Sequence, residues 1–254
     1  MNGEVTTLAE WIRDARSVTV LSGAGVSTHS GIPDYRGPQG VWTKDPTAAA
    51  LSTIDSYVSD PEVRKRAWRA RRDHPAWQAE PNQAHRALVS LERAGKLRAI
   101  ITQNIDELHQ RAGSDPDKVI EVHGTMFQVE CLTCGERVSM AEALKRVEAG
   151  EEDPSCLACG GMQKSATVSF GQELRPEVIT AAARAARECD VFLAVGSSLT
   201  VQPAAGLCLE ALNDGGRLVV INNDETQYDA VADGVLNAPV QEALPDLIDR
   251  ALNA

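Results

Sequence analysis

Four cysteines form two pairs with the spacing of a zinc site. Cys131 and Cys134 make the first Cys-x-x-Cys pair, Cys156 and Cys159 make the second, and residues 135–155 separate them. Two such pairs bind zinc through four thiolates arranged as a tetrahedron. Because four thiolates leave no open coordination position, the spacing predicts a structural zinc ion that holds together a segment with few apolar residues.

A glycine-broken loop follows the apolar stretch Ser17–Leu21 (SVTVL). Gly23, Ala24 and Gly25 let the backbone turn sharply and approach a ligand such as a phosphate, because no bulky side chain stands in the way. The loop lacks the third glycine of the dinucleotide fingerprint, so a tight strand-to-helix turn is an alternative. The next segment, Gly31–Gly37 (GIPDYRG), places a pair of charges among chain breakers, and this addition favours a binding loop.

One histidine is placed for proton transfer. His123 ends an apolar run directly before Gly124, where an imidazole has a pKa suited to acid–base chemistry at neutral pH. A buried structural histidine is the competing interpretation. His109 is predicted to pack against its neighbours or to cap a helix. The remaining three are predicted to lie in loops or on the surface: His29, His74 and His85.

An amide and a carboxylate, Asn104 and Asp106, follow another apolar stretch and could point into one pocket from an irregular loop. Capping of a helix over residues 107–112 would explain Asp106 equally well. Two further segments offer contacts to a nucleotide. Gly196-Ser197-Ser198 can bind phosphate or ribose oxygens through backbone N–H groups, and Asn222 lies where a dinucleotide fold contacts ribose hydroxyls.

These side chains need a scaffold, and the pattern of the chain predicts one. Short apolar runs rich in β-branched residues alternate with stretches of helical periodicity. Strands this apolar are buried on both faces, so the pattern predicts an α/β fold with a doubly wound, Rossmann-like parallel sheet covered by helices. Ligands of such sheets bind at the carboxyl ends of the strands, and polar or glycine-rich residues follow every predicted strand. The strands are expected at 17–21, 98–102, 119–122, 166–170, 190–195 and 217–222, and the helices at 6–16, 82–96, 176–188, 203–213 and 241–252.

Two segments interrupt this alternation and are predicted to form a small second domain. Residues 41–80 are charged and helical, and residues 127–164 contain the paired cysteines. The Rossmann-like domain is therefore expected to comprise residues 1–40, 81–126 and 165–254.

The composition argues against several classes of protein. The chain has 254 residues and a formal net charge of −11, so an electrostatic clamp for nucleic acid is not expected. No apolar run is long enough for a membrane span, and the N-terminus lacks the basic and apolar regions of a signal peptide. We expect a cytoplasmic enzyme with no direct nucleic-acid partner and no membrane partner.

Taken together, these segments resemble the sirtuin (Sir2) family of NAD-dependent protein lysine deacylases, in its bacterial form. The matching stretches follow the family's order and span most of the chain. They are GAGVSTHSGIPDYRGPQGVW at Gly23–Trp42, TQNIDELH at Thr102–His109, VHG at Val122–Gly124, the two cysteine pairs, FGQEL at Phe170–Leu174, GSSLTVQPAA at Gly196–Ala205 and INND at Ile221–Asp224.

The resemblance implies an NAD-binding domain and a smaller lobe made of a zinc ribbon and helices, with the acyl-lysine peptide entering between them. In the family's reaction the acyl oxygen attacks the nicotinamide ribose and expels nicotinamide, and a histidine, here His123, activates a ribose hydroxyl. The products are free lysine, nicotinamide and O-acyl-ADP-ribose. Asn104 and Asp106 would take part in catalysis at the nicotinamide pocket. The residues implied to contact NAD are Gly23, Ala24, Gly25, Ile32, Asp34, Tyr35, Arg36, Gln103, Asn104, Ile105, Asp106, Gly196, Ser197, Ser198, Asn222, Asn223 and Val240.

The acyl group is less well defined than the reaction. In the branch that removes acidic acyl groups, a tyrosine and an arginine three residues later bind the acyl carboxylate, and Trp68 and Arg71 stand at these positions. An indole lacks the phenol's hydroxyl, whereas Arg71 keeps the charge. Acetyl, succinyl and other short acyl groups therefore stay open, and a solvated arginine face is the alternative. Two other departures from the family are Tyr35, where phenylalanine is common, and Glu107, where many members have a small residue.

Two other functions stay open beside deacylation. One is mono-ADP-ribosyl transfer to a protein side chain, and the other is a non-catalytic zinc adaptor that senses NAD. The expected partners are proteins or peptides with acylated lysines, and the chain is expected to be a monomer. Gly31–Arg36 is expected to form a mobile flap over nicotinamide.

Overall fold

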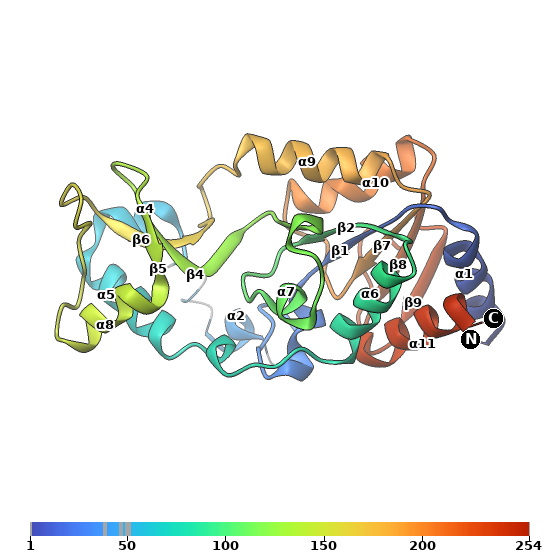
Figure 1. Cartoon of the computed structure of the whole chain (residues 1–254), viewed down its shortest axis with the longest axis horizontal. Helices are drawn as coiled ribbons and strands as arrows, with labels where there is room; N and C mark the ends of the chain where they lie inside the picture. Colours follow the sequence, from blue (N-terminus) through green and yellow to red (C-terminus); the bar gives the residue numbers. More distant parts are fainter. Residues whose placement is uncertain (1, 38–39, 46–47, 49–51, 254) are drawn as a thin grey trace. The chain divides into compact units, whose positions relative to one another are not determined.

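The computed structural model describes the chain except for residues 1, 38–39, 46–47, 49–51 and 254. Contacts among the described residues divide them into two units, most of whose helices and strands are labelled in Figure 1. The larger unit comprises Met1–Asp34, Ala79–Val122 and Arg175–Ala254, and the smaller unit comprises Tyr35–Gln78 and His123–Leu174.

A six-stranded parallel sheet with the order β3-β2-β1-β7-β8-β9 forms the centre of the larger unit. The order reverses between β1 and β7, and the carboxyl ends of these two strands are the switch point where doubly wound sheets bind ligands. The predicted Rossmann-like α/β fold is thus confirmed. The sequence pattern does not reveal β9, because its four residues are too short an apolar run. The strands are Val18–Ser22 (β1), Leu97–Thr102 (β2), Val119–Glu121 (β3), Val191–Val195 (β7), Arg217–Asn222 (β8) and Gly234–Asn237 (β9).

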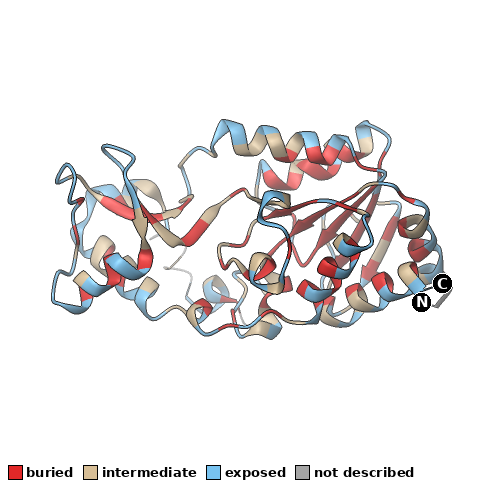
Figure 2. Cartoon of the chain, viewed as in Figure 1, coloured by how far each residue is buried: buried red, intermediate tan, exposed pale blue. Residues whose placement is uncertain are grey.

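Alternate residues of the strands enter two separate apolar cores. In β7, Val191, Leu193 and Val195 belong to one core, and Phe192 and Ala194 belong to the other. The central strands β1 and β7 are buried throughout, as Figure 2 shows, because helices cover both faces of the sheet. The first core is completed by Asn2–Asp14 (α1), Gln83–Arg93 (α6) and Val240–Asn253 (α11), and the second by Pro176–Arg187 (α9) and Leu207–Asn213 (α10).

Shorter helical turns of the larger unit lie in the connections, many of them at the ends of strands. No helix among the described residues is both long and apolar enough to cross a lipid bilayer. These turns are Ala24–Val26 (η1), Thr28–Ser30 (η2), Leu108–Ala112 (α7), Pro116–Lys118 (η4) and Ala204–Gly206 (η5).

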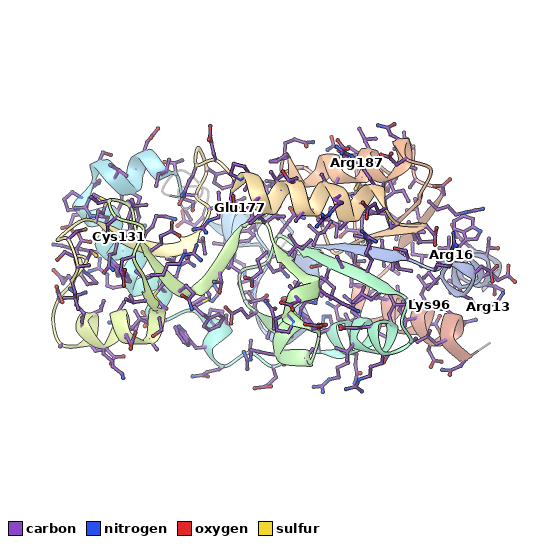
Figure 3. The ribbon with its side chains drawn as sticks, turned by 45° about the horizontal axis from the view of Figure 1, so that its top comes forward. Arg13, Arg16, Lys96, Cys131, Glu177 and Arg187 are labelled. Atoms are coloured by element: carbon purple, nitrogen blue, oxygen red, sulfur yellow. The ribbon has the colours of Figure 1, made fainter. Side chains whose placement is uncertain are left out.

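The end of α1 is fastened to the sheet by a lysine and an aspartate. The last carbonyls of a helix have no partner within the helix, and Lys96 satisfies two in this region by donating from Nζ to the carbonyl oxygens of Arg13 at 2.6 Å and Ala15 at 2.9 Å. The backbone N–H of Arg16 donates to Asp190 Oδ2 at 2.7 Å. Figure 3 labels Arg13, Arg16 and Lys96. These contacts fix the point at which the chain enters β1.

A three-stranded antiparallel sheet with the order β5-β4-β6 forms part of the smaller unit. Beside it, Trp68 is 2% exposed and packs with Val129, Met140 and Leu144 in an apolar core. The elements of this unit are Val41–Lys44 (α2), Ile54–Ser59 (α4), Pro61–Arg72 (α5), Pro75–Trp77 (η3), Gly124–Cys131 (β4), Arg137–Ser139 (β5), Met140–Glu148 (α8) and Gln163–Thr167 (β6).

The strand predicted at 166–170 as part of the parallel sheet is wrong. The observed strand is β6, which pairs antiparallel with β4 in the smaller unit. Strand propensity reveals an extended segment but not the partner with which it pairs. As a consequence, residues 165–174 lie in the smaller unit, whose ranges of 35–78 and 123–174 differ from the expected 41–80 and 127–164.

Candidate functional site

Two loops cross at the switch point of the sheet with their backbones in direct contact. The N–H of Gly25 donates to the carbonyl oxygen of Gly196 at 2.8 Å, and that of Gly23 donates to Val195 at 3.0 Å. A Cβ on Gly23 would lie 2.6 Å from the Gly196 oxygen, and one on Gly25 would lie 2.9 Å from the Gly196 Cα. Gly23 and Gly25 must therefore lack side chains because the backbone at Gly196 packs directly against them. The sequence pattern does not reveal this reason.

Asn104 and Asp106 are bound to the loop that follows β1. Asn104 Nδ2 donates to the carbonyl oxygen of Gly23 at 3.1 Å and to Ser27 Oγ at 3.2 Å. Ser27 Oγ donates to Asp106 Oδ2 at 2.7 Å. The two predicted side chains are thus brought together, and both are buried, with exposures of 8% and 4%.

Asp106 also serves the helix that follows it. Its Oδ1 accepts the N–H of Leu108 at 3.0 Å, at the start of α7. The helix begins at Leu108 with Glu107 as its N-cap, so Asp106 lies one residue before the cap position and the capping interpretation is off by one residue. Asp106 still accepts the N–H of the first helical residue, together with the bond from Ser27. Burial raises the pKa of Asp106, and the hydrogen bonds from Ser27 and Leu108 oppose that rise by favouring the charged form.

The loop after β7 meets the residue after β2. Gln103 Nε2 donates to Ser197 Oγ at 2.9 Å, and the N–H of Leu199 donates to the same hydroxyl oxygen at 3.2 Å. Ser198 is exposed, and its hydroxyl lies 3.0 Å from that of Thr200. Gln103, Gly196 and Ser197 therefore lie together, as expected from the carboxyl ends of neighbouring strands.

The residues after β8 are turned toward their own loop. Asn222 Nδ2 donates to the carbonyl oxygen of Asp224 at 2.8 Å, and Asn223 Nδ2 lies 3.4 Å from Asp224 Oδ1. Val240 begins α11 and is 4% exposed. The next residue, Gln241, donates from Nε2 to the carbonyl oxygen of Gly25 at 2.8 Å.

Gln241, Ser27 and Asn82 are contacts of the glycine loop that sequence reasoning missed. Asn82 Nδ2 donates to the carbonyl oxygen of Val26 at 2.8 Å and to Ser30 Oγ at 3.0 Å. Asn82 could have been found as a helix cap, because it precedes a strongly periodic helix. Gln241 carries no such signal, since it follows the unrecognised strand β9.

The predicted flap is divided between the two units. Ile32 and Asp34 belong to the larger unit, and Ile32 is 9% exposed. Tyr35 and Arg36 belong to the smaller unit, where the Arg36 guanidinium lies 4.5 Å from the centre of the Trp42 ring. Burial lowers the pKa of Arg36. Ile105, in the larger unit, is half-buried.

His123 follows Val122, the first residue after β3. It is half-buried and begins the second segment of the smaller unit. Its carbonyl oxygen accepts the N–H of Val168 at 2.9 Å. Gly124 has a φ of +71°, and a Cβ there would lie 2.0 Å from the carbonyl oxygen of Ala166. Only glycine fits this position, and the backbone on the carboxyl side of the histidine is held by the pairing of Gly124 with Thr167 and by the bond from Val168.

His109 and His85 form a buried pair, with ring centres 5.0 Å apart. His109 lies 2.9 Å from Ser22 Oγ, which gives its own proton to Thr102, so His109 Nε2 is the donor. Burial lowers the pKa of His109 to about 3 and that of His85 to about 4, and both rings are therefore neutral at physiological pH. The packing role predicted for His109 is confirmed, but the surface position predicted for His85 is wrong. His85 accepts the N–H of Asn82 at 3.3 Å in the capping box of α6, on the apolar face of that helix.

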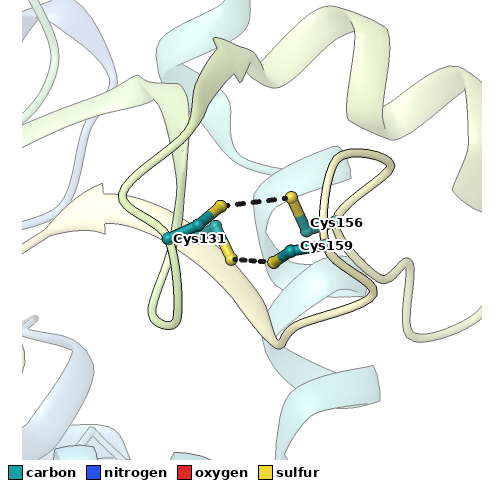
Figure 4. Close-up of side chains that lie close together, drawn as sticks. Cys131, Cys156 and Cys159 are labelled. Carbon is teal, nitrogen blue, oxygen red and sulfur yellow. Dashed lines mark hydrogen bonds between the residues drawn. The ribbon is translucent and has the colours of Figure 1, made fainter.

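The four paired cysteines converge in the smaller unit. Their sulfur atoms all lie within 4.8 Å of one another, with Cys131 Sγ 3.6 Å from Cys159 Sγ and Cys134 Sγ 3.8 Å from Cys156 Sγ. Figure 4 shows this cluster, with Cys131, Cys156 and Cys159 labelled. A tetrahedron with Zn–S bonds of about 2.3 Å has edges of about 3.8 Å. Left-handed glycines follow both pairs, with a φ of +75° at Gly135 and +72° at Gly160. The donor set therefore fits a structural zinc ion, as the spacing predicts.

A Rossmann-like unit with polar side chains gathered at its switch point, linked to a unit with four clustered cysteines, defines a zinc-containing dinucleotide-binding protein. Comparison with known proteins makes this more specific. Residues 23–203 match the Sir2 family. The chain is 54% identical over 231 residues to NAD-dependent protein deacetylase 2 of Streptomyces coelicolor, which covers 91% of this chain and 96% of that relative. It is 44% identical over 250 residues to NAD-dependent protein deacetylase 1 of Pyrobaculum aerophilum, covering 97% of this chain and 94% of that relative.

The solved structures agree with the sequence comparisons. A Sir2 structure with a p53 peptide and NAD+ matches with a TM-score of 0.86 and 34% identity over 98% of each chain. The chain belongs to the Sir2 family, which confirms the resemblance seen in its motifs.

The close contact between the two loops predicts that one methyl group added at Gly25 lowers both stability and NAD affinity. Gly25→Ala should destabilise the fold by about 1–3 kcal/mol through overpacking and should weaken NAD binding, because the added Cβ meets the Gly196 backbone. Denaturant unfolding and calorimetric titration with NAD measure the two effects. Gly95→Ala is the control for NAD binding, since no atom lies within 4 Å of the added Cβ; because its φ is +74°, it should lower stability through backbone strain but leave NAD affinity unchanged. NAD affinity equal to that of the wild type in Gly25→Ala would contradict this account.

The sulfur cluster predicts that zinc holds the smaller unit together. Cys156→Ser should abolish zinc binding and expose sites in residues 123–174 to limited proteolysis, because a core as small as that around Trp68 needs a further crosslink. Metal analysis and mass mapping of the cleavage sites measure this. Cys208→Ala, which alters a buried cysteine of the larger unit, should retain the metal. A zinc content unchanged in Cys156→Ser would refute the assignment.

Proposed function

We propose that this chain is an NAD-dependent protein lysine deacylase, which consumes NAD and yields nicotinamide, O-acyl-ADP-ribose and free lysine. The proposal rests on one observation above all: the Asn104 and Asp106 side chains are fixed to the glycine loop at the switch point of a Sir2-family fold. Relatives matched over most of the chain are NAD-dependent protein deacetylases.

Asp106 is the residue that we assign to charge stabilisation. When bound, NAD supplies the ribose that receives the acyl group and nicotinamide as the leaving group, so positive character develops on a ribose carbon. A carboxylate already fixed by Ser27 and Leu108, with little water around it, stabilises such charge without having to reorganise. Both amide hydrogens of Asn104 are used within the protein, which leaves its Oδ1 as the amide atom for a ligand.

His123 is the residue that we assign to proton transfer. An imidazole takes a proton from a hydroxyl at neutral pH and returns it later. The backbone on either side of His123 is restrained, by β3 before it and by Gly124 after it. His109 and His85 are not candidates for this role, because burial lowers the pKa of His109 to about 3 and that of His85 to about 4, and such weak bases do not accept a proton at neutral pH. Monomeric state and a cytoplasmic location stay predictions.

Turnover of an acylated peptide tests this function. Wild-type protein with NAD and an acetyl-lysine peptide should release nicotinamide in step with deacylation, and His123→Ala should slow the reaction by about 100-fold or more. His29→Ala, at an exposed histidine, should react like the wild type. Radiolabelled adenine that ends on protein would instead favour mono-ADP-ribosyl transfer. NAD binding without turnover of any acyl peptide would favour the zinc adaptor.

Arg71 supports a wider acyl range than acetyl. Its guanidinium donates to two hydroxyls of β6, to Ser165 Oγ at 3.1 Å and to Thr167 Oγ1 at 3.3 Å. It makes no ion pair with the part of the chain that the structure describes, and burial lowers its pKa. Because neutral hydroxyls do not balance the positive charge of this half-buried side chain, a carboxylate on the acyl group would be a favourable partner. Trp68 is enclosed in the core of the smaller unit, so we leave it out of this proposed contact.

A comparison of acyl groups distinguishes acyl recognition by Arg71 from bracing of β6. Arg71→Ala should lower kcat/KM for a succinyl peptide by at least about tenfold, the loss of a charge-assisted bond, and that for an acetyl peptide by less than about threefold. Arg69→Ala, on the exposed side of α5, is the control and should change neither. Equal losses for both peptides would mean that Arg71 only supports β6.

A further inference from the structure

A glutamate and a glutamine form a pair at the edge of the parallel sheet. Glu121 is the last residue of β3 and lies opposite Thr102 on β2, the residue before Gln103 and Asn104. Gln110, on α7, donates from Nε2 to Glu121 Oε1 at 3.0 Å. The pair therefore joins α7 to the strand that leads into His123.

The carbonyl oxygen of the Gln110 side-chain amide accepts no hydrogen bond from the described residues. This atom, Oε1, is buried. A buried carbonyl oxygen left without a donor is costly. An ionised Glu121 has no proton to offer, whereas a carboxylic acid carries one O–H beside its acceptor oxygen. A protonated Glu121 can thus pair with both atoms of the amide at once.

The surroundings of Glu121 also disfavour its charge. Burial raises the pKa of Glu121 to about 7, and the carboxylates of Glu107 and Asp106 act in the same direction, whereas the bond from Gln110 acts against it. Both charges come from the segment between β2 and α7. Glu107 has a φ of 54°, in the left-handed region that a non-glycine residue rarely adopts.

We propose that Glu121 is a positioning residue that carries a proton: as a neutral carboxylic acid it binds both atoms of the Gln110 amide, and when it ionises that pairing is lost. The proton passes to solvent, and a further negative charge then appears near those of Glu107 and Asp106. Because the phosphates of NAD are anionic, this added charge weakens NAD binding. The effect on NAD rests on the proposed function, whereas the protonation state does not.

The direction of the pH effect follows from the shifted pKa. Glu121 has a higher pKa in the folded chain than in the unfolded one, so between about 4.5 and about 7 the folded chain binds more protons. Its contribution to stability is complete below this range and is lost as the pH rises through about 7. The same ionisation should raise the KM for NAD by about threefold between pH 6 and pH 8.5.

A carbon-13 NMR titration of glutamate side-chain carboxyls tests the protonation state without any turnover. One carboxyl should titrate near pH 7, should be missing from Glu121→Gln, and should titrate at lower pH in Glu107→Gln because a neighbouring charge is gone. If every carboxyl titrates near its ordinary value, or if Glu107→Gln leaves the midpoint unchanged, the proposal is overturned.

The pH dependence of the KM for NAD tests the positioning role. Glu121→Gln keeps an amide partner for Gln110 and stays neutral, so its KM should not change with pH, whereas Glu10→Gln, at an exposed site, should follow the wild type. A titrating Glu121 combined with the same KM profile in Glu121→Gln would overturn the positioning role. An inactive wild type would refute the deacylase proposal and leave the NMR result standing.

Discussion

The backbone crossing of Gly23–Gly25 and Gly196 is the contact on which the rest of the site depends. It brings the loops after β1 and β7 together at the point where the strand order reverses. The carbonyl of Gly23 then serves as an acceptor for Asn104, and Ser27, a few residues further on, supplies the donor for Asp106. A ligand at this edge therefore meets polar groups whose positions are set by backbone rather than by mobile side chains.

The smaller unit is stabilised in a different way from the larger one. Its apolar core is centred on Trp68 and contains few large side chains, so hydrophobic burial alone gives limited stability. The four cysteines supply a crosslink in place of a larger core. This arrangement allows β6 to carry buried polar groups, including Ser165 and Thr167, which accept hydrogen bonds from Arg71 of α5. Such groups would be too costly in a unit held together by its core alone.

The sequence was sufficient to predict features that depend on a repeated hydrophobic pattern or on the spacing of metal ligands. Strands buried on both faces predict a parallel sheet, and the cysteine spacing predicts the cluster of sulfur atoms. Features that depend on tertiary pairing could not be predicted. The segment at 166–170 has strand propensity, but its first two residues end β6, which pairs antiparallel with β4, and propensity does not indicate that partner. His85 looks like a surface residue until its bond to the N-cap of α6 is known.

The position of Trp68 has a consequence for optical spectroscopy. Of the four tryptophans, only Trp11 belongs to the larger unit, where its ring is covered by the Arg217 guanidinium at 4.3 Å. Trp42, Trp68 and Trp77 belong to the smaller unit, and Trp68 is shielded from water. Intrinsic fluorescence is therefore weighted toward the smaller unit. A fluorescence melting curve would follow mainly the zinc-bearing part of the chain, and circular dichroism would follow the helices of both.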